Sequence, residues 1–254
     1  MQYKKRLGQH FLVDQNIIDK LIKHIKPLKS EMFLEIGPGD GALTKSIINK
    51  VNRLTLVEKD SGLIKNLCEI SDGYPNTEII RCDFLKYDLN QITYPLRVIG
   101  NLPYNISTEI IFKMCSHQNT IDMHFMLQKE VVDRIVAEHN SKSFGRLSVM
   151  AQAYFNVKRL FNISENVFFP KPKVKSSFIR FTPKNNIFFS KKQENIFFDL
   201  VKSAFEGRRK MIRKSLDAFL QKTDFDNLKI NDALRAENLS VNDYLRLSEY
   251  VEKN

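Results

Sequence analysis

The sequence predicts an α/β protein with a mostly parallel sheet, one antiparallel edge and a small all-helical C-terminal domain. Short apolar runs such as MFLEIG (32–37) are almost uninterrupted, and segments with helical periodicity separate them. Strands that are apolar throughout are typical of a parallel sheet with helices on both faces. After residue 183 the apolar pattern is helical, which predicts a separate helical domain.

The elements follow the order that this architecture requires. A helix over 14–28 carries isoleucine and leucine at helical spacing, with Asp14 as its N-cap and Pro27 as its stop. Segments 151–161 and 176–183 are expected to form an antiparallel pair that closes one edge of the sheet. The other expected strands are 32–37, 54–60, 77–85, 97–101 and 123–128, and the helices beside them are 41–51, 61–70, 108–115 and 129–139.

The C-terminal part is expected to begin at about residue 184, with a linker at 185–193. The helices predicted there are 191–206, 208–221, 230–236 and 241–251. A chain of 254 residues has room for one large domain, or for one domain with a small appendage. We therefore predict two domains, residues 1–183 and residues 184–254.

The net charge of +11 is high and favours a polyanionic partner. Lysine and arginine gather in three segments, residues 1–29, 156–184 and 205–214, while the rest of the chain is slightly acidic. One such cluster alone could be a solvated surface. Three clusters together favour a nucleic-acid interface.

Several protein classes are disfavoured. Cys68, Cys82 and Cys115 are far apart in sequence and show no ligand spacing with histidine, which argues against disulfides or a zinc site and fits a reducing compartment. The first residues lack the apolar core of a signal peptide, and no apolar segment has the length that a membrane span needs. A soluble cytoplasmic protein without a metal site is expected.

Three strand ends carry residues that suit a nucleoside, and ligands of an open parallel sheet bind beyond the carboxyl ends of its strands. Gly37, Gly39 and Gly41 follow the first strand, where glycine permits a tight turn and the close approach of a ligand. Glu58 ends the second strand and could accept hydrogen bonds from ribose hydroxyls. Asp83 ends the third and could accept one from an adenine amino group. Together they predict an adenosine-containing cofactor, and the absence of GxxxxGK[ST] disfavours a P-loop nucleotide triphosphatase.

The fourth strand runs into RVIGNLPYNIST (97–108), where proline ends it. The side-chain oxygen of Asn101 and the carbonyl of Leu102, held outward by Pro103, can accept the two hydrogens of an exocyclic base amine. Tyr104 can stack on a base that has left its helix, which stabilises the base by roughly 1–3 kcal/mol. The motif therefore predicts a pocket for an extruded base beside the cofactor.

Four segments resemble the rRNA adenine N6-dimethyltransferases: FLEIGPGDGALT (33–44), NLPYNIST (101–108), MHFMLQKEVVDRIVA (123–137) and VFFPKPKVKSSFIRF (167–181). GRLSVMAQ and LRAENLSVNDYLRLSEY are similar to the bacterial small-subunit branch of that family. The resemblance implies a Rossmann-like class I methyltransferase sheet with S-adenosylmethionine as its cofactor. It also implies methyl transfer to N6 of two adjacent adenines near the 3′ end of small-subunit rRNA, within a pre-30S particle. We expect the protein to act as a monomer.

The resemblance also implies roles for individual residues. It implies that Glu58 holds the ribose, that Asp83 holds the adenine ring and that Phe168 covers the target base opposite Tyr104. Phe169 is expected to be a packing residue. The catalytic set is Asn101, Leu102, Pro103, Tyr104 and Phe168, and the cofactor set is His10, Leu12, Gly37, Gly39, Glu58, Asp83 and Asn101.

The basic segments then acquire a function as contacts to RNA phosphates. The N-terminal residues of this set are expected to guide RNA toward the cofactor, and the others to lie at helical spacing near the start of a C-terminal helix. The set comprises Lys4, Lys5, Arg6, Arg208, Arg209, Lys210, Arg213 and Lys214.

Three alternatives stay open at this point. A large-subunit rRNA methyltransferase of the macrolide-resistance type shares the same core and differs in substrate. A DNA adenine methyltransferase is disfavoured because those enzymes usually carry a DPPY-type motif instead of NLPY. A non-catalytic ribosome-assembly factor would keep the fold without the activity, although the complete set of site residues argues against such a loss.

Overall fold

The computed structural model describes residues 10–115, 117, 119–185, 187–207 and 209–254. Four residues that the sequence predicts to contact RNA therefore lie outside the described residues: Lys4, Lys5, Arg6 and Arg208.

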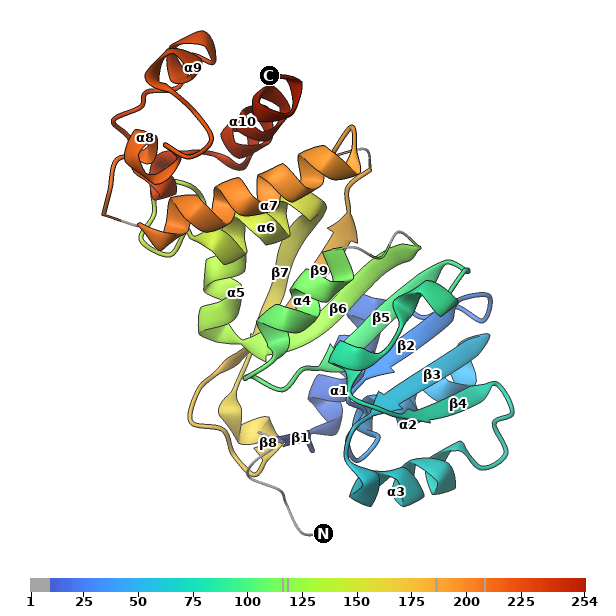
Figure 1. Ribbon diagram of the computed structural model, residues 1–254. Helices are drawn as coiled ribbons and strands as arrows, with labels where there is room; N and C mark the ends of the chain where they lie inside the picture. The colour runs from blue at the N-terminus through green and yellow to red at the C-terminus, as the bar shows by residue number, and fades with distance from the viewer. Residues whose placement is uncertain (1–9, 116, 118, 186, 208) are drawn as a thin grey trace. The chain divides into compact units, whose positions relative to one another are not determined.

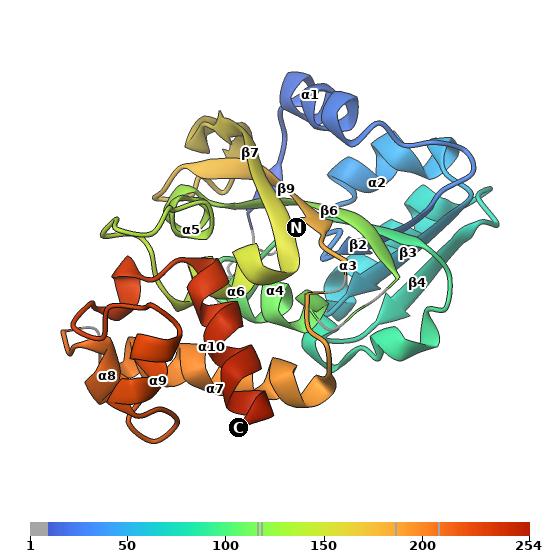
Figure 2. The ribbon, with the colours of Figure 1, turned by 90° about the horizontal axis from the view of Figure 1, so that it is seen from above.

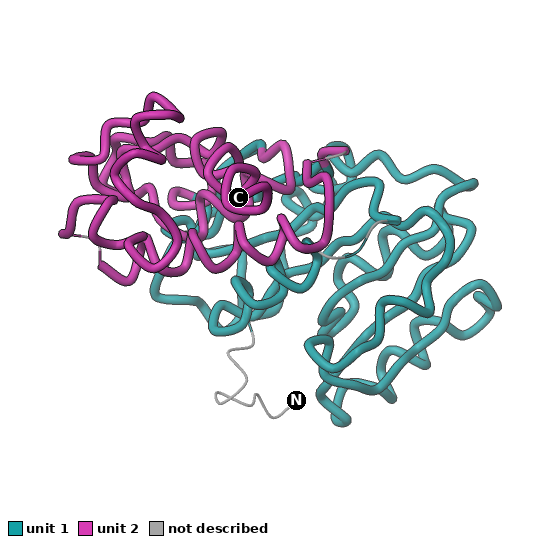
Figure 3. Tube along the Cα trace, turned by 45° about the horizontal axis from the view of Figure 1, so that its top comes forward, with its two compact units in different colours: residues 1–132, 158–183 teal, residues 133–157, 184–254 magenta. Residues whose placement is uncertain are grey.

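The chain forms two compact units, and neither is one continuous segment (Figure 3). The first combines residues 1–132 with 158–183, and the second combines 133–157 with 184–254. Residue 183 ends the first unit, but residues 133–157 group with the C-terminal part. The two domains expected from the sequence stay a prediction.

A seven-stranded sheet is the centre of the fold, in the strand order β4-β3-β2-β5-β6-β9-β7 (Figure 1). Neighbouring strands from β4 to β6 are parallel, and β9 runs antiparallel to β6, so the predicted α/β class with an antiparallel edge is confirmed. The strands are β2 Met32–Ile36, β3 Arg53–Glu58, β4 Thr77–Arg81, β5 Leu96–Asn101, β6 Thr120–Gln128, β7 Phe155–Ile163 and β9 Ser176–Pro183.

Helices cover both faces of this sheet. Figure 2 shows α1 and α2 on one side of the strands and α4 on the other. Asp14 caps α1 as predicted, since its carboxylate accepts from the backbone N–H of Ile17 at 3.0 Å. The helix ends at Ile25, one residue before the left-handed Lys26 and two before the predicted stop at Pro27. The helices flanking the parallel strands are α1 Gln15–Ile25, α2 Ala42–Ile47, α3 Ser61–Ser71, α4 Ser107–Cys115 and α5 Lys129–Ile135, with 3₁₀ turns at Ile48–Lys50, Phe84–Lys86 and Leu89–Gln91.

A second, two-stranded sheet was not expected from the sequence. The strand β1 (Phe11–Leu12) pairs antiparallel with β8 (Phe168–Phe169), which follows a 3₁₀ turn at Glu165–Val167. Two residues are too few to show a strand pattern. This pairing brings residues 10–12 beside the FFPKP segment (168–172). His10 and Pro170, which are 160 residues apart in sequence, are in hydrogen-bond contact there.

The amino-terminal edge of the large sheet holds a buried arginine. Arg97 directs all five of its N–H groups to acceptors. The carboxylate of Asp122 accepts two of them at 2.8 and 3.1 Å, and Glu31 accepts another at 2.8 Å. The carbonyls of Ile25 and Lys26, at the end of α1, accept the remaining two. Arg97 therefore joins α1 to two strands.

The second unit is helical, but its helices differ from the prediction. The predicted helices 191–206 and 241–251 are confirmed as α7 and α10, whereas the helix predicted over 208–221 is reduced to the four residues of α8. The backbone N–H groups of Ile212 and Arg213 donate to the carbonyls of Leu234 and Asp232. These N–H groups therefore bond to a later segment and not to carbonyls of a preceding helical turn. The helices are α6 Arg146–Tyr154, α7 Lys191–Glu206, α8 Ile212–Ser215, α9 Lys222–Asn227 and α10 Val241–Lys253, with a 3₁₀ turn at Ala236–Asn238.

The same pairing explains one further difference, and two others are independent of it. The short helix predicted over 230–236 is absent because these residues pair with 211–213, where Met211 and Arg235 form an isolated β-bridge. The strand predicted from residue 151 begins at Phe155, since α6 occupies the preceding residues. Helix α9 was not predicted.

Candidate active site

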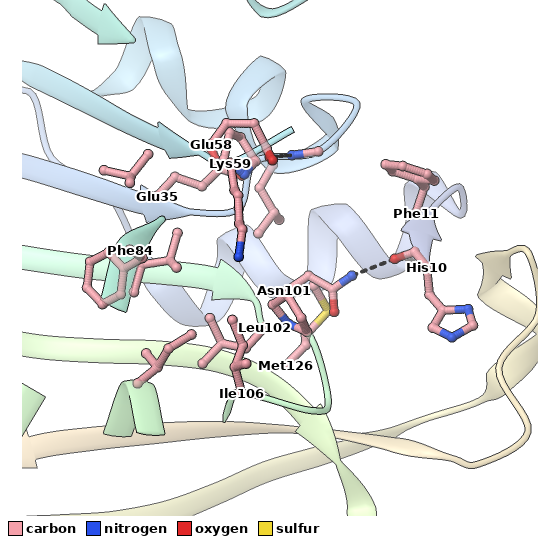
Figure 4. A pocket seen from close by; sticks show the side chains of 18 of the residues that line it. His10, Phe11, Glu35, Glu58, Lys59, Phe84, Asn101, Leu102, Ile106 and Met126 are labelled. Carbon is pink, nitrogen blue, oxygen red and sulfur yellow. Dashed lines mark hydrogen bonds between the residues drawn. The ribbon is translucent and has the colours of Figure 1, made fainter. Parts of the chain in front are cut away.

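A pocket in the first unit lies at the carboxyl ends of the parallel strands (Figure 4). Parallel strands present these ends at one edge of the sheet, as expected from the sequence. Residues from the loops after β2, β3, β4 and β5 line the pocket together with residues 10–12. The pocket brings together ten of the predicted site residues: His10, Leu12, Gly37, Gly39, Glu58, Asp83, Asn101, Leu102, Pro103 and Tyr104.

The glycine loop after β2 follows a backbone path that glycine favours. Gly37 and Gly39 have φ angles of 63° and 62°, in the left-handed region. A Cβ atom on Gly39 would lie 3.1 Å from the ring of Phe11, whereas nothing lies within 4 Å of the Cβ position of Gly37. The loop is therefore closely packed at Gly39 and open at Gly37, where a ligand can approach the backbone.

Glu58 ends β3 with a buried carboxylate. One oxygen accepts from the backbone N–H of Gly39 at 3.1 Å (Figure 4). The other accepts from the backbone N–H of Asp60 at 2.7 Å. Burial raises the pKa of Glu58 despite these hydrogen bonds. Because each carboxylate oxygen has two lone pairs, the group can still accept hydrogen bonds from a bound ligand.

Asp83 follows the next strand, β4, and pairs with a lysine that follows β3. Lys59 donates to one carboxylate oxygen at 2.7 Å, and the backbone N–H of Leu85 donates to the other at 3.0 Å. The hydrogen bond from Lys59 holds the pKa of Asp83 below its usual range. Asp83 is therefore an ionised acceptor at the pocket, and Phe84 lines the pocket directly after it.

Asn101 ends β5, and a backbone carbonyl fixes the orientation of its amide. The Nδ2 group donates to the carbonyl of His10 at 2.7 Å (Figure 4). A carbonyl only accepts, so the NH₂ group must face His10 and the side-chain oxygen must face away from it. Within the described residues, that oxygen accepts no hydrogen bond, and it is available to accept one from a ligand.

Leu102 and Pro103 follow Asn101 and leave the sheet. The backbone N–H of Leu102 donates to Met126 at 3.2 Å, which fixes the first residue after the strand. In the part of the chain that the structure describes, nothing donates to the carbonyl of Leu102. The segment therefore offers a second acceptor in the residue that follows Asn101, and both residues line the pocket.

Tyr104 is held at both its hydroxyl and its ring. Its hydroxyl lies 2.8 Å from that of Ser176, the first residue of β9. Its ring stacks on His10, with centroids 5.6 Å apart and planes inclined by 30°. The Nδ1 atom of His10 lies 2.6 Å from the carbonyl of Pro170, so Nδ1 carries the proton. His10 therefore joins Tyr104, Asn101 and the FFPKP segment.

Further acidic groups that were not predicted from the sequence also line the pocket. Glu35 is buried on β2, with Thr44 donating to it at 2.7 Å, and its burial raises its pKa to about 8. Burial also raises the pKa of Asp40. Sequence position could have indicated both, because Glu35 precedes the glycine loop and Asp40 lies within it. Other lining residues outside the predicted set include Phe11, Lys59, Phe84 and Met126.

Phe168 is not among the residues that line the pocket. It is 3% exposed and belongs to the same core cluster as Leu12 and Met126. Its neighbour Phe169, expected to be a packing residue, is 53% exposed. The packing expectation for Phe169 is wrong, because alternate residues of β8 point to opposite faces. The role of Phe168 as a cover for the target base stays a prediction.

The predicted RNA contacts of the second unit occupy a turn and a short helix. Arg209 and Lys210 are exposed in the turn before α8, and only Arg213 and Lys214 lie within that helix. The predicted helical spacing across all of them is therefore wrong. Arg213 forms an ion pair with Asp232 at 3.1 Å, while Lys214 is exposed.

Metal and membrane sites were not expected from the sequence. Among the described residues, no group of three histidine, cysteine or acidic residues could hold a metal ion. None of their helices combines the length and apolar character needed to cross a membrane. Within the described part of the chain, Cys68, Cys82 and Cys115 form no disulfide bond.

The sequence model of a protein family described as Ribosomal RNA adenine dimethylase matches residues 1–253, nearly the whole chain. The chain belongs to the ribosomal RNA adenine dimethylase family. Methyltransferases of this family use S-adenosylmethionine as the methyl donor, which agrees with the cofactor predicted from the glycines and the two acidic strand ends. The roles of individual site residues stay predictions.

Curated relatives agree with the family assignment over their full length. The chain is 43% identical, over 262 residues, to Ribosomal RNA small subunit methyltransferase A of Francisella tularensis subsp. novicida. The alignment covers 99% of this chain and 100% of the relative. The corresponding protein of Francisella tularensis subsp. tularensis shows the same identity and coverage.

Solved structures agree in fold. A dimethyladenosine transferase from Plasmodium falciparum superposes with a TM-score of 0.83 and 26% identity, over 94% of this chain and 96% of that one. The 23S rRNA methyltransferase ErmE superposes with a TM-score of 0.75 over 95% of this chain and 99% of that one. At 23% identity, the second likeness supports the fold alone.

The pocket suits this cofactor chemically. S-adenosylmethionine carries a positive sulfur, an amino group and ribose hydroxyls, all of which favour acidic or hydrogen-bond-accepting partners. Glu35, Asp40, Glu58 and Asp83 line the pocket, and Gly37 leaves its backbone open to a ligand. Burial raises the pKa values of Glu35, Asp40 and Glu58, because the protein does not fully stabilise their ionised forms. A bound ligand with a positive charge and hydrogen-bond donors would stabilise those ionised forms.

Proposed function

We propose that this protein transfers methyl groups from S-adenosylmethionine to N6 of two adjacent adenines near the 3′ end of small-subunit rRNA. The full-length likeness to small-subunit methyltransferases supports this substrate over the large-subunit alternative. A pre-30S particle in the cytoplasm would be the acceptor, and a monomer the active form. The net charge of +11 suits such an RNA partner.

The orientation of the Asn101 amide is the main observation that supports adenine N6 as the atom that receives the methyl group. The His10 carbonyl orients the amide of Asn101 so that its oxygen is available to a ligand, next to the carbonyl of Leu102. An adenine amino group carries two hydrogens, and these two oxygens can accept both. A base without an exocyclic amine would leave both acceptors unpaired, which costs about 1–3 kcal/mol for each buried group.

These residues would contribute position and charge stabilisation to the reaction. When bound, S-adenosylmethionine supplies a methyl group on a positively charged sulfur that is a good leaving group. The amine nitrogen would form a bond to that methyl carbon while the carbon–sulfur bond breaks and leaves a neutral thioether. The nitrogen would acquire positive charge, which the oxygens of Asn101 and Leu102 would stabilise until the extra proton is lost to water. Tyr104, anchored by Ser176, would hold the base by stacking while the amine is oriented.

The second methyl transfer to the same nitrogen has a different hydrogen-bond count. After one transfer the amine retains a single hydrogen, so only one of the two acceptors still has a donor. That acceptor and the stacking by Tyr104 would still hold the base. Dimethylation therefore requires that the pocket tolerate one unpaired oxygen, which access of water to the pocket would relieve.

Glu58 and Asp83 would hold the nucleoside of the cofactor. The carboxylate of Glu58 would accept hydrogen bonds from the ribose hydroxyls, and Asp83 would accept from the adenine ring. Gly37 would lie against the methionine part, where its open Cβ position leaves room. His10 and Leu12 would border the cofactor from the β1 segment.

The test supplies labelled S-adenosylmethionine and three acceptors: undermethylated small ribosomal subunits, naked large-subunit RNA and duplex DNA. Digestion and mass spectrometry then identify the modified nucleoside. Dimethyladenosine in the small-subunit RNA alone is expected. Label in the large-subunit RNA would overturn the substrate and keep the chemistry. Cofactor binding without label in any acceptor would favour a non-catalytic assembly factor.

A further inference from the structure

An exposed aromatic side chain lies next to the pocket and has no part in the proposed reaction. Phe169 is 53% exposed, whereas Phe168 before it is 3% exposed and packs in the core. The alternation of β8 produces this difference, because one residue of the pair faces the core and the other faces away from it.

Backbone pairing fixes Phe169 beside residues of the pocket. In the β1–β8 ladder, Phe169 is opposite Phe11, which lines the pocket and packs against the glycine loop. The next residue, Pro170, accepts from His10, whose ring stacks on Tyr104. Phe169 is therefore held at the rim, connected through His10 to the ring that is predicted to stack on the target base.

Lysines follow this phenylalanine at every second position. Lys171, Lys173 and Lys175 are all exposed, and Lys171 forms an ion pair with Glu165 at 3.7 Å. Exposed aromatic rings interleaved with cations are the combination with which proteins bind single-stranded nucleic acid, since the rings stack on bases and the cations contact phosphates. An isolated exposed phenylalanine would need no explanation, but this one is followed by a basic run and borders the pocket.

We propose that Phe169 stacks on the nucleotide adjacent to the adenine held in the pocket, with the three lysines contacting the flanking phosphates. This inference rests on the proposed function and deepens it. Extruding one base removes a stacking partner from its neighbour. The ring of Phe169 would replace that partner and thereby stabilise the extruded state. Since the proposed substrate has two adjacent adenines, the stacked neighbour would itself be an adenine awaiting methylation.

The first test compares Phe169→Ala, Phe169→Leu and Phe169→Tyr with the natural protein, using undermethylated small subunits. Alanine and leucine should each lower kcat/KM for the subunits by roughly 5- to 100-fold, which is about 1–3 kcal/mol at about 1.4 kcal/mol per tenfold. Tyrosine should retain most of the activity, because its ring also stacks. Affinity for S-adenosylmethionine, measured by calorimetry, should stay unchanged in all three.

The matched control is Phe189→Ala, which removes an 80% exposed phenylalanine of the second unit. It should leave kcat/KM unchanged. Activity of Phe169→Leu equal to that of the natural protein would overturn the inference, since leucine keeps the apolar surface and lacks only the ring. If the natural protein itself forms no dimethyladenosine, the proposed function fails, which is a distinct result.

A second test locates the stacked nucleotide. Binding is measured for a naked, unmethylated RNA fragment from the small-subunit 3′ end that contains the two adenines, and for the same fragment with either adenine replaced by an abasic site. Phe169→Ala should weaken binding of the intact fragment but have almost no further effect once the stacked neighbour is absent. Equal weakening on all three RNAs would overturn the stacking. Unchanged RNA binding, with weaker binding of whole subunits, would overturn it too and would indicate contact with a ribosomal protein.

Discussion

At the amino-terminal edge of the sheet, each side-chain N–H group of Arg97 donates to an acceptor, whereas side chains at the carboxyl edge keep hydrogen-bond acceptors that are not used within the described residues. Glu58 and Asn101 there keep unused lone pairs. At the amino edge, Asp122 accepts from both Arg97 and Arg180, so its buried charge is paired twice. At the carboxyl edge, the raised pKa values of Glu35 and Glu58 show that burial exceeds compensation.

This difference separates groups that stabilise the fold from groups that await a ligand. Buried charges with complete partners stabilise one arrangement of strands, and removing one partner leaves the other unpaired. Incompletely paired acids in a pocket cost stability in the free protein, and such groups gather at functional sites. Breaking a complete pair at the amino edge should therefore lower stability. Replacing a group at the carboxyl edge should lower ligand binding or catalysis, and should leave stability unchanged or raise it.

The largest effect is expected on stability, for Arg97→Met. The change leaves Asp122 and Glu31 without their main partner in a buried setting, so the free energy of unfolding should fall by about 3–5 kcal/mol. Denaturant unfolding measures the decrease. The matched control, Arg53→Met, removes an ion pair with Glu78 whose side chains are 48% and 49% exposed, and should cost less than about 1 kcal/mol. Equal decreases in the free energy of unfolding of the two variants would show that the buried Arg97 network stabilises the fold no more than an exposed ion pair does.

The next effect is expected on catalysis, for Asn101→Ala. Methyl transfer should fall by about 10²–10³-fold, as for the loss of one preorganised hydrogen-bonding group in other active sites. Affinity for S-adenosylmethionine should stay within a few-fold, and unfolding should change little. Single-turnover assays with labelled cofactor and calorimetry measure the two quantities, with the exposed Asn90→Ala as control. Near-normal turnover would show that the amide oxygen is not the acceptor.

A smaller effect is expected on cofactor binding, for Glu58→Gln. The amide keeps an acceptor oxygen but lacks the charge that strengthens hydrogen bonds, so affinity for S-adenosylmethionine should fall roughly 10- to 100-fold, or about 1.5–3 kcal/mol. Titration calorimetry measures it. Glu78→Gln, which changes an exposed acid on the neighbouring strand, is the control. Unchanged affinity would count against a ribose contact.

The carboxyl edge was the more predictable of the two from sequence. Apolar strands end visibly where Glu58, Asp83 and Asn101 begin the loops, and a parallel sheet brings those ends together without knowledge of register. The pairing of Arg97 with Asp122 depends on the exact register of β5 and β6, which includes a shift between Leu96 and Arg97. No local pattern encodes such a shift.

Contacts distant in sequence account for the other missed features. The carbonyl of His10 lies 91 positions from Asn101, and it decides which way the amide points. The exposure of Phe169 and the burial of Phe168 depend on a two-residue strand that pairs with β1. Arg209 and Lys210 lie in a turn instead of a helix because residues 211–213 pair with a later segment.

A pH-dependent effect on stability is expected from Glu35. Its pKa is raised from 4.5 to about 8, so between these values the folded state holds a proton that the unfolded state has released. The contribution of Glu35 to stability is therefore fully present below the unfolded pKa and is lost as the pH rises toward 8. Glu35→Gln removes this dependence, so the stability of the variant relative to the natural protein should rise with pH, by at most about 1.4 kcal/mol per pH unit.

Unfolding in denaturant at pH values from about 5 to 8 measures this difference. The glutamine side chain of the variant keeps an oxygen that can accept from Thr44, so the comparison changes the titrating group and little else. A difference between the two proteins that does not vary with pH would show that Glu35 is ionised in the folded state. The surrounding groups at the carboxyl edge would then stabilise the charge of Glu35 enough to offset the cost of its burial.

The smallest effect is expected on RNA binding, for the double variant Arg209→Glu and Lys210→Glu. Both side chains are exposed in the turn before α8, so their replacement should leave unfolding and cofactor affinity unchanged. If each contacts one phosphate, the slope of log affinity against log salt should become shallower by about 0.7–0.9 for each phosphate that is no longer neutralised. Arg213, which already pairs with Asp232, should contribute less than its exposed neighbour Lys214. Filter binding of small-subunit RNA across salt concentrations measures the slopes, and an unchanged slope would make this turn ordinary surface.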